Sequence, residues 1–232
     1  MRMRKWSAIA AASAGLMLTG VLGGCASNAA PAATTAEVDV TAAWLDGGRT
    51  IGIVTQGSSS CVPVAGDVTA TGDKISVTFA DAATDQPCTT DMAPRVTLAT
   101  VPEGVDPTKD VTLEVSGDGI AGTASLAGVA GLAAGGTTDY APSAGWTGAD
   151  GQFVLLTWGS SSCVPVVQDL TAAETTVTMT FETPAADRVC TLDMAPRALV
   201  AQVDGMKGVA DVQLTLSGDS FDGTTLPIYG VS

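Results

Sequence analysis

Two copies of one segment occupy most of this chain, and they are offset by 102 residues. The block Gly57–Val64 (GSSSCVPV) recurs without change as Gly159–Val166. A second block, Cys88–Arg95, recurs as Cys190–Arg197 with one substitution. Solenoid proteins repeat every 20–50 residues or so, whereas a period near 100 indicates two copies of one small domain.

Each copy has the pattern of an all-β domain. Ile75, Val77 and Phe79 alternate with polar residues, which predicts a half-buried strand. The continuous apolar runs at 51–55 and 153–158 predict central strands that are buried on both faces. Short strands between Gly, Asp and Pro turns favour two tandem β-sandwich or barrel-like domains, each with about six or seven strands.

The N-terminus has the features of an export signal. Three basic residues within positions 2–5 precede an uncharged run from about residue 6 to 22, too short and too rich in small residues for a typical membrane span. The run ends at Leu22–Cys25 (LGGC), which resembles the lipobox of bacterial lipoproteins. The resemblance implies a signal peptide at residues 1–24 and a diacylglycerol group on Cys25. The alternative is an ordinary secretory peptide, cut between Ala26 and Ala30.

These features predict the organisation of the whole chain. After the signal peptide, residues 25–40 are expected to form a flexible tether, because they contain few large apolar side chains. The first β domain is predicted at 41–129, a low-complexity linker at 130–143 and the second β domain at 144–232. The expected location is the outer face of the cytoplasmic membrane.

The charge of the chain restricts its partners. Outside the signal peptide, seven Lys and Arg stand against 24 Asp and Glu, a formal charge of −17. A surface of this sign repels phosphate backbones, so nucleic-acid binding is not expected. It also adds no attraction to anionic lipid, and the predicted membrane contact is therefore the lipid on Cys25 alone.

Four cysteines remain after Cys25, and they could pair in three ways. The repeat selects Cys61–Cys88 and Cys163–Cys190, because each pair then closes the same 27-residue interval within its own copy. Disulfides persist in exported proteins, and a loop of this length would stabilise each domain by roughly 3–4 kcal/mol. With no histidine in the chain and widely spaced cysteines, neither a metal site nor a cofactor is predicted.

The serine-rich turn before Cys61 is interpreted as structural. A serine nucleophile needs a base such as histidine or a desolvated lysine, and no suitable pair occurs here. The serine hydroxyls are expected to bond backbone groups of a turn that the disulfide anchors. The acidic turns at 116–119 and 217–223 are interpreted as hairpin turns, with calcium binding as the lesser alternative.

The candidate binding residues lie in the second repeated block. Asp91 and Asp193 can accept bonds from backbone amides, and Arg95 and Arg197 can pair with these or with neighbouring acids. Scaffolding is the leading interpretation, and anion binding at the rim is the alternative. Trp158 replaces Gln56 beside the serine turn in the second copy only, where it either contacts a ligand or fills the core.

The paired blocks GSSSCxP and CTxDxAPR resemble those of lipoproteins from high-GC Gram-positive bacteria. That resemblance implies no activity. The leading hypothesis is a non-catalytic binding or interaction protein of the cell envelope, whose partner is an envelope protein or a small ligand. A structural spacer is the second hypothesis, and a histidine-free envelope hydrolase is the third.

Overall fold

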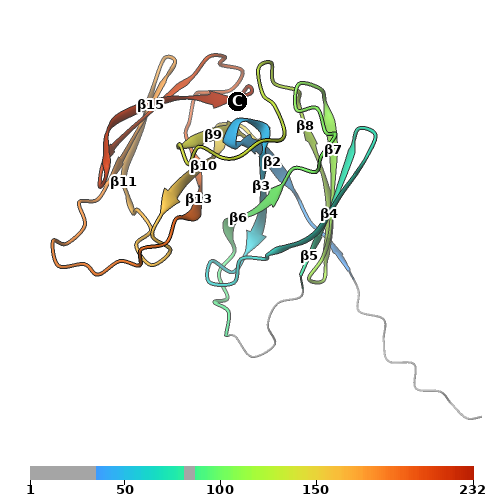
Figure 1. Ribbon diagram of the computed structural model, residues 1–232, viewed down its shortest axis with the longest axis horizontal. Helices are drawn as coiled ribbons and strands as arrows, with labels where there is room; N and C mark the ends of the chain where they lie inside the picture. Colours follow the sequence, from blue (N-terminus) through green and yellow to red (C-terminus); the bar gives the residue numbers. More distant parts are fainter. Residues whose placement is uncertain (1–34, 81–86) are drawn as a thin grey trace, which may run out of the picture. The chain divides into compact units, whose positions relative to one another are not determined.

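The computed structural model describes residues 35–80 and 87–232, which belong to one compact unit (Figure 1). The predicted signal peptide, the lipidated Cys25 and the tether up to residue 34 lie outside the described residues. The described part consists of strands, turns and one short 3-10 turn, η1 (Asp46–Gly48). The predicted all-β fold is therefore confirmed.

The two repeats contribute corresponding strands in the same order along the chain. The first repeat contains β2 (Thr41–Leu45), β3 (Thr50–Gly57), β4 (Ala65–Thr71), β5 (Lys74–Phe79), β6 (Ala93–Thr100), β7 (Val111–Gly117) and β8 (Ile120–Leu126). The second contains β9 (Ser143–Trp146), β10 (Gln152–Gly159), β11 (Val167–Ala173), β12 (Thr176–Phe181), β13 (Ala195–Gln202), β14 (Gln213–Gly218) and β15 (Phe221–Tyr229).

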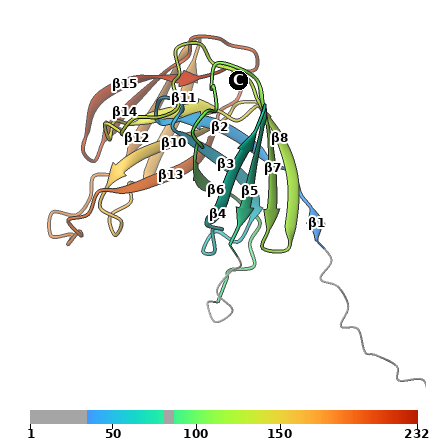
Figure 2. The same ribbon diagram turned by 45° about the vertical axis from the view of Figure 1, so that its right-hand side comes forward.

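The first repeat is a sandwich of two sheets. Strands β2-β3-β6 form one sheet, and strands β8-β7-β5-β4 form the other and lie side by side in Figure 2. The predicted alternation in β5 is confirmed, because Ile75, Val77 and Phe79 are buried while Lys74 and Thr78 are exposed. The buried side chains of β5 join those of β3 and β7 in one hydrophobic core.

The second repeat has the same sandwich, with one difference in strand pairing. The longer strand β15 pairs with β9 in parallel, with Ile228 opposite Ala144. This pairing joins the two sheets into one seven-stranded sheet of order β11-β12-β14-β15-β9-β10-β13. In the first repeat, β8 pairs instead with the short strand β1 (Ala36–Glu37).

Because of strand β1, the first β domain begins earlier in the chain than predicted. Ala36 pairs with Ile120, Val38 donates its backbone N–H to the carbonyl of Ala121, and Val40 is buried in the core. The tether was predicted to reach residue 40, but residues 36–40 belong to the first sandwich. The available signal was the alternation of apolar and polar residues over 36–40, which is typical of a half-buried strand.

The two repeats pack against each other through β2, β3 and β6 of the first repeat and the corresponding strands β9, β10 and β13 of the second. Strands β3 and β10 are buried on both faces, as the continuous apolar runs predicted. One face of β3 covers its own core, while Val54 on its other face and Leu45 of β2 pack against Val154 and Leu156 of β10. A hydrogen bond of 2.9 Å from Thr41 Oγ1 to Gln152 Oε1 also joins the repeats. The two tandem β domains therefore share an apolar interface.

Asp46 connects both repeats with the segment between them. Its buried carboxylate accepts two bonds from Arg49, at 3.0 and 2.7 Å, and one from Thr138 Oγ1 at 3.0 Å. Its backbone N–H donates to Ser143 Oγ at 2.8 Å. The hydrogen bond with Asp46 raises the pKa of Arg49. The predicted linker is irregular, yet it is tied to the first repeat by Thr138 and by the buried Leu132.

Candidate functional site

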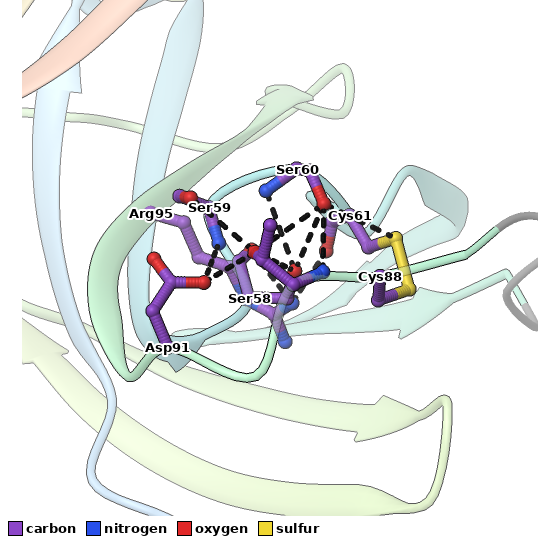
Figure 3. The surroundings of a disulfide bond; sticks show 8 residues. Ser58, Ser59, Ser60, Cys61, Cys88, Asp91 and Arg95 are labelled. Atoms are coloured by element: carbon purple, nitrogen blue, oxygen red, sulfur yellow. Dashed lines mark hydrogen bonds between the residues drawn. A yellow bond between two sulfur atoms is a disulfide. The ribbon is translucent and has the colours of Figure 1, made fainter.

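In each copy, the disulfide joins the two blocks of sequence that the copies share. Strand β3 ends at Gly57, and the serine turn that follows is tied by Cys61–Cys88 to the segment that precedes β6 (Figure 3). The Cα atoms of this pair are 5.5 Å apart, and those of Cys163–Cys190 are 5.6 Å apart. Both predicted disulfides are confirmed.

Hydroxyl groups hold the serine turn in place. Thr89 donates its backbone N–H to Ser60 Oγ at 3.0 Å, and its hydroxyl lies 2.8 Å from Ser58 Oγ. The second turn repeats these contacts, with Thr191 N–H 3.0 Å from Ser162 Oγ. The interpretation as a turn held by local hydrogen bonds is confirmed.

Asp91 belongs to the same hydrogen-bond network. Its Oδ1 accepts the backbone N–H of Ser59 at 3.2 Å and the hydroxyl of Thr89. Donation from Thr89, and then from Ser59, lowers the pKa of Asp91 to about 2. Asp193 accepts the corresponding bonds, with Ser161 N at 3.1 Å, and its pKa is likewise lowered to about 2. Both aspartates are therefore ionised acceptors that fix the loop.

Arg95 binds a different part of the turn. Its guanidinium donates to the carbonyl oxygen of Cys61, and Arg197 donates in the same way to Cys163 at 3.0 Å. Arg95 also lies against Gly57, where a Cβ atom would be 2.5 Å from the guanidinium carbon. Within the described residues these carbonyl contacts replace the suggested Arg95–Asp91 ion pair, and the glycine leaves room for the arginine.

The loops around the two disulfides carry exposed apolar side chains. In the described residues, every exposed large apolar side chain except Tyr140 and Val231 lies in the segments 62–64, 92, 164–167 and 189–194. Met92 is 74% exposed, and Leu192 is fully exposed. The residue patterns described above did not predict this surface. The available signal was the presence of Val, Met and Leu in Pro- and Cys-rich segments outside any strand pattern.

The second loop is the more apolar of the two. Val189 and Leu192 replace Pro87 and Thr90 of the first copy, while Met194 corresponds to Met92. Val189 is 91% exposed. The repeats therefore share one loop framework but present different side chains on it.

Trp158 packs between the two repeats. Its half-buried ring contacts Tyr140 edge-on, with ring centroids 5.2 Å apart, and joins the interface cluster of Val154 and Leu156. Its carbonyl oxygen accepts Arg197 Nη2 at 2.8 Å. Trp158 therefore packs in the interface between the repeats and not in the core of its own copy, and it also lines a cavity beside the second disulfide.

This cavity has a volume of about 290 Å³. Besides Trp158 and the disulfide, its lining includes Pro184, Arg188, Arg197 and Asp219. Burial lowers the pKa of Arg197, and the charge of Asp219 acts in the opposite direction.

The two acidic turns connect hairpin strands. Asp118 lies between β7 and β8 with φ of 50°, and Asp219 lies between β14 and β15 with φ of 46°. Their interpretation as hairpin turns is confirmed. In residues 35–80 and 87–232, no three His, Cys, Asp or Glu side chains are placed to hold a metal ion. The same ranges contain no helix with the length and apolar character needed to cross a membrane.

Compared with known family models, curated proteins and solved structures, the chain matches none.

Proposed function

We propose that this chain is a lipid-anchored binding protein of the cell envelope, which contacts a protein partner through its two disulfide loops. The observation that carries the proposal is the gathering of exposed apolar side chains around both disulfides. Grouped exposed apolar side chains mark interaction surfaces more often than scattered ones do. Nothing else in the loop framework requires Met92, Leu192 or Met194 to be apolar.

The construction of the loops supports binding. Each loop is fixed by a disulfide, by the Thr89 or Thr191 network and by an arginine. A loop that is already ordered loses less conformational entropy when a partner binds. The flexible thioether of Met92 and Met194 can adapt to an apolar partner surface. We infer that the partner presents an apolar patch with a basic rim, which the acidic chain would attract.

The packing of the repeats supports a spacer role less than it supports a binding role. A repeat that served only to add length would need no apolar face against its neighbour, whereas Leu45, Val54, Val154 and Leu156 form such an interface. The packing instead holds the two loops on one compact unit. The lipid on Cys25, inferred from the lipobox, would keep that unit close to the membrane surface.

The proposal is tested by photo-crosslinking in cells that produce the full-length chain. Photoreactive residues at Met92 and Met194 should capture one recurrent protein, while the same residue at the exposed Thr224 of β15 should not. With the photoreactive residue kept at position 194, the double variant Val189→Ser and Leu192→Ser should lose capture at the second loop without a change in thermal unfolding, because both side chains are exposed. Equal, diffuse labelling from all three positions would favour the spacer.

A further inference from the structure

The cavity beside Cys163–Cys190 is a candidate site for a small ligand, separate from the exposed apolar loop. Arg188 and Arg197 both line it, and they are two of the seven basic residues outside the signal peptide. Asp219 is the acidic residue in the lining. The formal charge of the lining is thus +1, in a chain of strongly negative charge. The positive charge of the lining favours a ligand that carries an anionic group.

Two donors on the lining residues are unsatisfied. Arg197 uses Nη1 and Nη2 to bind the carbonyl groups of Cys163 and Trp158. Its buried Nε, and the buried Nε1 of Trp158, have no hydrogen-bond partner within the described part of the chain. Buried donors without partners are rare in folded proteins and usually have an explanation. Both donors belong to residues that line the cavity, so polar groups without partners lie next to it.

Two of the lining residues occur in the second copy only. Arg188 corresponds to Gln86 of the first copy, and Trp158 corresponds to Gln56. Arg197, by contrast, has its counterpart in Arg95, with the same contact to a cysteine carbonyl. The shared arginine is explained by the loop framework. Arg188 is not part of that framework, and it lines the cavity together with Trp158, which also packs in the interface between the repeats.

We propose that this cavity binds a small carboxylate ligand, whose carboxylate is held by Arg188 beside Arg197. A single negative charge matches the net charge of the lining, whereas a doubly charged phosphate would leave excess negative charge next to Asp219. Planar guanidinium groups suit carboxylate geometry. Trp158 and Pro184 would cover a short apolar part of the ligand. The volume lies at the lower end for ligand pockets, so the ligand is a small acid or the C-terminal end of a peptide.

The test is a titration of the full-length chain, followed through the indole N–H signal of Trp158 in NMR spectra. The probes are N-acetyl-Ala-Ala, its C-terminal amide and propionate. N-acetyl-Ala-Ala should shift the Trp158 signal in a saturable manner, and its amide should not. If propionate binds as well, the site takes small acids in general, and if only the peptide binds, it takes peptide ends. Both results support the proposal, while no saturable shift with either acid overturns it.

Two variants test whether the ligand binds at this cavity. Arg188→Gln restores the residue of the first copy at an exposed side chain, so the fold should be unaffected and the affinity should fall about tenfold or more. Lys109→Gln removes one exposed positive charge elsewhere and should leave the affinity unchanged. Equal affinities of the wild type and Arg188→Gln would overturn the assignment. Neither variant alters Met92 or Met194, so this test and the crosslinking test fail independently.

Discussion

Gly52 and Val154 occupy equivalent positions in the two repeats, and they face each other across the interface between β3 and β10. A Cβ atom on Gly52 would lie 3.1 Å from Val154 Cγ1 and 2.9 Å from Leu45 Cδ1. One repeat therefore supplies the space that the valine of the other fills. The two copies have diverged so that they fit each other as unequal halves.

Replacing Gly52 with valine should disrupt this fit. The added side chain overlaps Leu45 and Val154, so the free energy of unfolding should fall by about 1–3 kcal/mol. Urea unfolding of the purified chain measures the change. Adding Val154→Gly to the same chain exchanges the valine and the glycine between the two repeats. This second change should recover part of the lost free energy of unfolding. A double variant that is less stable by the sum of both single effects would contradict direct contact between these positions.

Asp46→Asn tests the contact that joins the repeats and the linker. The variant removes the charge that Arg49 pairs with, while Arg49 keeps 25% of its side chain exposed to water. We expect a loss of about 2 kcal/mol, less than the roughly 3–5 kcal/mol of a fully buried pair. The linker should also become more accessible to protease. Glu114→Gln in the exposed Lys74 pair is the control, with an expected change below about 1 kcal/mol.

The lowered pKa values of Asp91 and Asp193 predict acid sensitivity. Each folded pKa is about 2, below the unfolded value near 3.9. The resulting stabilisation is present above the unfolded pKa and is lost as the pH falls toward 2. In the double variant Asp91→Asn and Asp193→Asn, the thermal midpoint should therefore depend less on pH between about 4 and 2.

A matched control exists for this experiment. Asp67 and Asp169 also occupy equivalent positions in the two repeats, and both are exposed. Their double change to asparagine should leave the acid dependence of the thermal midpoint closer to that of the wild type. If both double variants show the same slope, the loop aspartates do not cause the acid sensitivity.

Cys25→Ala distinguishes the two interpretations of the N-terminus. If Cys25 carries the lipid, the variant should lose fatty-acid labelling and the mature N-terminus that begins at residue 25. If the signal is an ordinary secretory peptide cut between Ala26 and Ala30, processing should not change and the wild type should take up no fatty acid. Metabolic labelling and mass spectrometry of the N-terminal peptide separate these outcomes.

Several features of the fold follow from residue patterns alone. The alternation of Ile75, Val77 and Phe79 reports a half-buried strand, because successive side chains in a strand point to opposite faces. The disulfide pairing follows from the repeat, because equivalent cysteines in two copies form equivalent bonds. The apolar runs through β3 and β10 correctly indicated burial on both faces.

The candidate site was predictable only in part. Asp91 and Arg95 attracted attention because they recur with their charges, but the expected ion pair is replaced by separate contacts to Ser59 and Cys61. Hydrogen-bond partners depend on angles and distances that a linear pattern does not contain. Anion binding by Arg197 was considered, but the cavity and the part of Arg188 in it were not foreseen, because the lining residues are brought together from four separate segments of the second repeat.

The strand content, the disulfides and the presence of two similar halves can be read from the amino-acid order, since they depend on local periodicity and on equivalence between the copies. What covers the second face of β3, where Asp46 finds its partners and which side chains line the cavity depend instead on how distant segments fold together. A periodic pattern states that a face is buried, but any apolar surface of suitable shape could cover it. The choice between such surfaces depends on the three-dimensional fit of Gly52 against Val154.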